Sequence, residues 1–113
     1  MPRRRRQVAK ALAGVPRGSV LDHYTEKYGV TKGAWRAAHM VQIALVVQDF
    51  GRDFGNGDYI KYWGVDETTG WNHRREAREV YGDAWRDVAE HLAKLMAEQN
   101  VRSPAAAQRI ALA

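Results

Sequence analysis

The chain has 113 residues, of which 45% are hydrophobic and 27% are charged, and its formal net charge is +5. This length suffices for one domain with one modest core, and this balance is typical of a folded globular protein rather than a disordered one. The sequence contains no cysteine, which excludes disulfides, thiolate metal sites and cysteine nucleophiles.

The remaining chemistry-bearing residues are too scattered to predict a reaction centre. The four histidines are far apart in the sequence, and none forms a metal-binding pair with a second histidine four positions away. No paired carboxylates and no nucleophile with a nearby base stand out. We therefore expect no cofactor, no metal and no enzymatic activity.

Neither a membrane span nor a secretory signal is predicted. The longest apolar run, at residues 43–47, is far shorter than the roughly 20 residues that a membrane span requires. The basic start, MPRRRR, is followed by a stretch too short and polar to be the apolar part of a signal peptide. We expect a cytoplasmic protein.

The positive charge is concentrated at the start of the chain. Residues 1–18 carry six basic and no acidic side chains, whereas the other 95 residues carry 12 basic and 13 acidic ones. Such a basic arm suits a polyanion, because each neutralised phosphate releases condensed counterions. The alternative is a solvated tail that only aids solubility. The arginines assigned to the DNA backbone here are Arg3, Arg4, Arg5 and Arg6.

The first half of the domain predicts two helices. Ser19 can cap a helix that runs to about Tyr28 and ends at Gly29. Thr31 can cap a second, long apolar helix to about Phe50, although its run of branched residues at 43–47 is also compatible with a short buried strand. We favour a helix, because the apolar pattern is longer than a strand usually is.

The segment at residues 59–82, YIKYWGVDETTGWNHRREAREVYG, predicts a helix-turn-helix. Gly64 suits the turn because it tolerates positive φ, and Asp66 suits the N-cap of a second helix that ends near Tyr81. In such motifs the second helix enters the DNA major groove. Gly70 would let the two helices approach closely.

The remainder of the chain predicts one strong helix and one weak one. Asp83 can cap an amphipathic helix whose apolar face includes Trp85, Leu92 and Leu95. Ser103 and Pro104 can begin a short C-terminal helix. We divide the chain into a basic arm (1–18), a helical domain (19–100) and a tail or short helix (101–113).

An internal echo occurs at an offset of 35 residues. The sequence Tyr-Gly-Val-Thr that starts at Tyr28 resembles Trp-Gly-Val-Asp that starts at Trp63. Both place a glycine turn before a capping residue. This similarity is compatible with a duplicated helix-turn-helix, with shared turn chemistry or with chance.

The second helix of the motif carries the candidate site. Its predicted inward stripe is Gly70, Ala77, Val80 and Tyr81, and its predicted outward face is Thr68, Asn72, Arg75 and Glu79. Asparagine suits the adenine edge and arginine suits guanine, whereas flanking arginines suit phosphate. The candidates for base readout are Thr68, Thr69, Asn72 and Arg75, and those for the DNA backbone are Arg74 and Arg78.

Alternatives to this reading stay open for several side chains. We expect Trp71 to be a core or hinge aromatic rather than a base-stacking one, and His73 to be a surface or core imidazole with satisfied hydrogen bonds. The arginines could also form a solvated face that pairs with Glu76 and Glu79.

The span of residues 40–96 resembles a loosely defined group of small helix-turn-helix proteins of actinobacteria and their phages and plasmids. The shared features are a long apolar helix, then Tyr-x-x-Tyr-Trp-Gly-Val at residues 59–65, a capped helix, and an arginine and aromatic segment at residues 78–81. Asp66 replaces the usual hydroxyl cap, Gly70 falls where alanine is commoner, and the first 30 residues have no counterpart.

The resemblance implies DNA binding and a regulatory role. We therefore expect an all-α domain that binds double-stranded DNA in a sequence-specific way, as a transcriptional regulator or accessory factor of a phage or mobile element. A homodimer is also expected, through the helix around Ile43 or the helix from Trp85 to Met96, unless both fill one monomeric core. The alternative is an adaptor that docks on host transcription or replication machinery.

Overall fold

A computed structural model describes residues 19–98 of the chain. Within this range the chain is all-α, as predicted, and it contains no strand. The predictions for residues 1–18 and 101–113 lie outside the described residues. The elements are α2 (Val20–Tyr28), α3 (Val30–Phe50), α4 (Asn56–Trp63), α5 (Glu67–Tyr81), the 3-10 helix η1 (Gly82–Ala84) and α6 (Trp85–Glu98).

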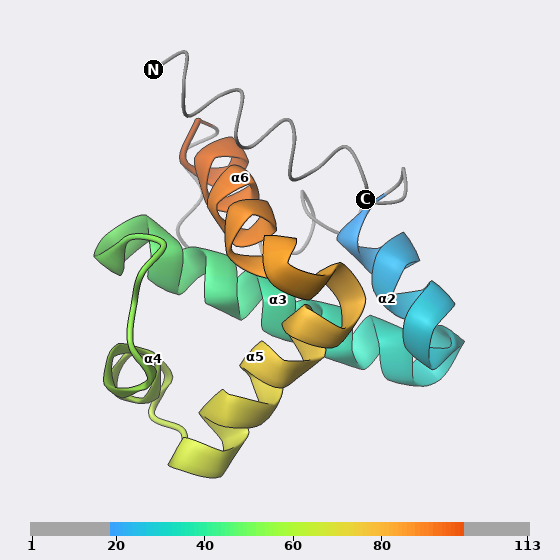
Figure 1. The fold of residues 1–113 in the computed structure, drawn as a ribbon, viewed down its shortest axis with the longest axis horizontal. Helices are drawn as coiled ribbons and strands as arrows, with labels where there is room; N and C mark the ends of the chain where they lie inside the picture. Colours follow the sequence, from blue (N-terminus) through green and yellow to red (C-terminus); the bar gives the residue numbers. More distant parts are fainter. Residues whose placement is uncertain (1–18, 99–113) are drawn as a thin grey trace.

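Helix α3 is the centre of the domain, and α2, α4, α5 and α6 all pack against it (Figure 1). Residues 43–47 are all buried and all helical, so the strand alternative for this run is wrong. A helix that is apolar on every side must be covered on every side. Helix α6 covers part of it with the buried side chains of Val88, Leu92 and Met96.

Both helices proposed as dimer surfaces thus belong largely to the core of a single chain. The residues around Ile43 are fully buried in the monomer, and Trp85 and Met96 are buried as well. Leu95, expected on the apolar face of α6, remains 36% exposed. The two surfaces are therefore occupied within the monomer.

Helices α2 and α3 cross very closely. Ser19 caps α2 in a reciprocal box with Asp22, with distances of 3.1 and 3.2 Å between side-chain oxygen and backbone nitrogen. At the crossing, a Cβ atom on Gly33 would lie only 2.4 Å from the Cα atom of Thr25. Only glycine therefore fits at this point of α3.

Two predicted N-caps are wrong. Helix α3 begins at Val30, so Thr31 lies inside it, and its N-cap is Gly29, which has no side chain to offer a hydrogen bond. Asp83 lies inside the 3-10 turn η1 and α6 begins only at Trp85. In both places the backbone turns at a glycine of positive φ, Gly29 or Gly82, and neither α3 nor η1 has a side-chain hydrogen bond at its N-cap.

The sequence echo does not correspond to a repeated turn. Gly29 has φ 89° and ψ 169°, and a helix restarts at the next residue. Gly64 is left-handed, with φ 64° and ψ 35°, and the next helix starts three residues later at Glu67.

Among the helices of residues 19–98, none combines the length and apolar character needed to cross a membrane.

Candidate nucleic-acid interface

Helices α4 and α5 form a helix-turn-helix with the turn that the sequence predicts. Gly64 adopts the left-handed conformation, and its N–H donates to the carbonyl of Ile60 at 2.8 Å. The carboxylate of Asp66 accepts the N–H of Thr69 at 2.7 Å and so caps α5. This hydrogen bond also holds the pKa of Asp66 below its usual range. The predicted bend and cap are both confirmed.

Gly70 brings α5 close to α4, as predicted. A Cβ atom at this position would lie 3.0 Å from Oδ1 of Asn56 and 3.3 Å from Cδ1 of Tyr59. In Figure 1, α4 is seen nearly along its axis while α5 runs across the view, so the two helices cross steeply. Steep crossing over a short glycine turn is the geometry that presents the second helix of such a motif outward.

The exposed face of α5 is centred on Trp71 and Arg75. Trp71, expected to be a core or hinge aromatic, is 47% exposed, so it is not a core residue. The guanidinium of Arg75 lies 5.2 Å from the centre of the Trp71 ring, one turn away. Of the other residues assigned to DNA, Thr68 and Arg78 are exposed, and Thr69, Asn72 and Arg74 are half-buried.

This face is therefore turned away from Asn72 and toward Arg78, relative to the prediction. The reason is that the buried stripe is wider than expected and extends to Glu76, one turn after Asn72. It contains Gly70, His73, Glu76, Ala77 and Tyr81, whereas Val80 is only half-buried. His73 and Glu76 were not predicted to belong to that stripe.

The two edges of the exposed face differ in charge. On one edge Arg74 donates to Oδ1 of Asn56 at 2.8 Å, and Arg78 lies over the ring of Trp85. On the other edge Glu79 accepts the hydroxyl of Tyr28 at 2.6 Å and lies 3.7 Å from Arg75. One edge of the face is thus cationic, and the other carries a carboxylate.

A buried polar cluster holds α5 in this orientation. The His–Glu cluster consists of Arg36, His39, Tyr59, His73 and Glu76, which come from α3, α4 and α5. Nδ1–H of His39 donates to Glu76 at 2.8 Å, and Nε of Arg36 lies 3.5 Å from the other carboxylate oxygen. Glu76 is thus buried in this cluster rather than lying on a solvated face, which corrects the alternative reading of that residue.

His73 completes the cluster and is a core imidazole, which is one of the two placements expected for it. Its ring stacks on His39 at 3.7 Å between centroids, and a hydrogen bond of 2.6 Å joins its Nδ1 to the hydroxyl of Tyr59. Burial, with a smaller contribution from His39, lowers the pKa of His73 to about 4. The ring is therefore neutral at physiological pH and contributes packing and a hydrogen bond.

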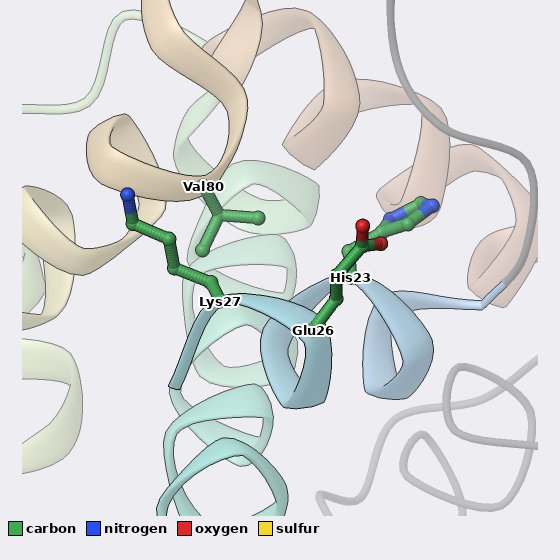
Figure 2. Close-up of a pocket in the computed structure, with 4 residues that line it drawn as sticks. All are labelled: His23, Glu26, Lys27 and Val80. Atoms are coloured by element: carbon green, nitrogen blue, oxygen red, sulfur yellow. The ribbon is translucent and has the colours of Figure 1, made fainter. Parts of the chain in front are cut away.

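A surface hollow of about 280 Å³ lies between α2 and the end of α5 (Figure 2). His23, Glu26, Lys27 and Val80 line it, and in Figure 2 the ammonium group of Lys27 points away from His23 and Glu26. Nδ1 of His23 is 2.8 Å from the hydroxyl of Tyr81.

Within residues 19–98 no group of three or more histidine, aspartate or glutamate side chains is placed to hold a metal ion.

Comparison with known proteins adds no relative. No family model matches the chain, and neither a curated protein nor a solved structure matches it.

Proposed function

We propose that the chain binds double-stranded DNA in a sequence-specific way through the exposed face of α5. The observation that carries this proposal is the arrangement of α5. It is bent away from α4 at Gly64, capped by Asp66, and anchored on its buried side by the His–Glu cluster. Its free side offers Trp71, Arg75 and Arg78. A rigid helix with an arginine-bearing outer face is what the major groove admits.

Each exposed side chain would have a distinct role at the DNA. Arg75 suits the O6 and N7 atoms of guanine, at about 1 to 3 kcal/mol of discrimination for a good bidentate contact. Trp71 offers an apolar surface for a thymine methyl group beside it. Thr68, Thr69 and Asn72 would read neighbouring positions, and Arg74 and Arg78 would contact phosphates. Arg3 to Arg6 would follow the backbone or the minor groove.

The helical domain would attract DNA through a cluster of arginines and not through its net charge. Residues 19–98 carry ten basic and thirteen acidic side chains, a net charge of −3. Four of those ten basic residues, Arg74, Arg75, Arg78 and Arg86, come from α5 and the start of α6. The basic arm would add the long-range attraction that the domain lacks. In this proposal the protein is a transcriptional regulator or accessory factor of a phage or mobile element.

A second candidate function is a protein-binding adaptor, and one observation favours it. Val30 and Trp35, at the start of α3, are 81% and 68% exposed, which is more than folding of the monomer requires. They would form the surface that contacts the partner of an adaptor, or the interface of the homodimer that a two-fold DNA site implies. An adaptor should show little affinity for random duplex DNA and little salt dependence.

The test is a selection of binding sites from random duplex DNA, repeated at two salt concentrations. We expect one enriched sequence at both concentrations and an affinity that falls steeply with salt. Absence of enrichment, together with no binding to duplex DNA at low salt, would reject the proposal and leave the adaptor.

A further inference from the structure

Three arginines gather where α5 meets α6. Arg78 and Arg86 both lie over the indole ring of Trp85, with their guanidinium carbons 6.0 and 4.4 Å from its centroid. Arg74, one turn before Arg78, is close enough to both for their charges to lower its pKa, in addition to the effect of burial. We call Arg74, Arg78 and Arg86 the arginine edge.

No carboxylate in the described part of the chain forms an ion pair with the arginine edge. By contrast, Arg52, just beside it, lies 2.6 Å from Asp87 and 3.7 Å from Glu90. The charge of Asp53 raises the pKa of Arg86, but this only partly offsets the burial that lowers the pKa of that arginine. In addition, Nε of Arg74 is buried without a hydrogen-bond partner. Three guanidinium groups close together, none of them ion-paired with a carboxylate of residues 19–98, indicate an anion site.

Arg86 is held in a fixed position. Its Nη1 donates to the backbone carbonyl of Arg52, and its guanidinium packs against Phe54 at 5.2 Å as well as against Trp85. Such a side chain loses little conformational freedom when it contacts a phosphate. A planar guanidinium also matches two phosphate oxygens at once.

We infer that Arg86, which lies outside the helix-turn-helix, joins Arg74 and Arg78 in binding the phosphate backbone of DNA. This inference rests on the proposed function and adds an orientation to it. The contacted strand would run along the α6 side of α5, because the opposite side presents Glu79. The cationic edge then faces phosphates and the carboxylate does not.

The experiment compares Arg86→Gln with Lys94→Gln. Both variants lose one positive charge from α6, but Lys94 is an exposed residue away from the arginine edge. Binding to one fixed duplex is measured between about 50 and 200 mM salt. We expect Arg86→Gln to weaken binding several-fold and to reduce the slope of log affinity against log salt by about 1, and we expect Lys94→Gln to change neither.

A second measurement uses the unaltered chain, so it does not depend on the folding of a variant. The Nε–Hε resonance of Arg86 is followed by NMR while the same duplex is added, and we expect it to shift in step with binding. If the unaltered chain shows no salt-dependent binding, the proposed function fails. If it binds but Arg86→Gln folds and keeps the full slope, or the Arg86 resonance stays unmoved at saturation, this inference is wrong while the proposed function stands.

Discussion

His39 and His73 stack face to face across the contact between α3 and α5, with ring centroids 3.7 Å apart and ring planes inclined by 13°. One ring donates to the buried Glu76, and the other shares a hydrogen bond with Tyr59 of α4. The pair therefore joins the three helices that set the orientation of the proposed DNA-binding face. Protonation of His73 would place a charge in this buried contact.

We predict that acid destabilises the fold in a way that depends on His73. Its pKa is about 4 in the folded chain and about 6.5 when exposed, so between these values the unfolded chain binds a proton that the folded chain does not. The free energy of unfolding should therefore fall as pH falls from about 6.5 toward 4, by about 1 to 2 kcal/mol from this residue. Urea denaturation at several pH values measures it.

The matched variant for this test is His73→Gln, which cannot take up a proton in that range. Ionisation of the carboxylates adds its own pH dependence to both proteins, so the difference between the two curves isolates the histidine. An identical pH dependence in both proteins would show that His73 does not titrate in the folded chain as its burial implies.

We predict that Gly33→Ala destabilises the domain by about 2 to 4 kcal/mol, despite the better helix propensity of alanine. The new methyl group would meet backbone atoms of Tyr24 and Thr25 within 2.7 Å, so α2 and α3 must move apart. Gly57→Ala, in α4, is the control, because a Cβ atom there would meet no heavy atom within 4 Å. Thermal denaturation compares the two, and equal melting temperatures would contradict the close crossing.

We predict that two substitutions of Asp66 affect different properties, one the stability of the domain and the other its affinity for DNA. Asp66→Ala removes the cap of α5 and should cost about 1 kcal/mol of stability. Asp66→Asn keeps a capping oxygen and removes a negative charge from the end of α5 nearest the proposed groove. Stability should then change little, while affinity for duplex DNA should rise. A loss of affinity in Asp66→Asn at unchanged stability would argue against DNA at this end of α5.

The turn and the cap were predictable because both depend on short-range interactions. Gly64 needs only its own positive φ, and Asp66 bonds to Thr69 three residues later. The apolar run at residues 43–47 was predictable as a buried helix for a similar reason, since its neighbours continue the pattern.

The exposed face of α5 was predicted less well because it depends on residues far away in the sequence. Glu76 is buried because His39 and Arg36 of α3 receive it, and no local pattern shows that pairing. With Glu76 and His73 inside, Trp71 is left outside, although its size favoured the core. Nothing in the local sequence sets Arg86 apart, and only the fold brings it beside Arg74 and Arg78.

We predict that Arg75→Ala and Arg78→Ala impair binding in different ways. Arg75 lies at the middle of the exposed face, beside Trp71, so its loss should relax sequence preference at one position. Arg78 belongs to the arginine edge, so its loss should weaken binding to all sequences alike and reduce the slope of log affinity against log salt by about 1. Competition between the selected site and single-base variants separates the two. A uniform loss in Arg75→Ala would make Arg75 a phosphate contact.

The central claim is that DNA covers the exposed face of α5, and the indole N–H resonances of the tryptophans test it most directly. Trp71 lies on that face, Trp35 is even more exposed but lies on α3, and the indole of Trp63 donates to the carbonyl of Gln42 inside the domain. On addition of the selected duplex, we expect the Trp71 signal to shift strongly and those of Trp35 and Trp63 to change little. A shift at Trp35 with none at Trp71 would contradict the account.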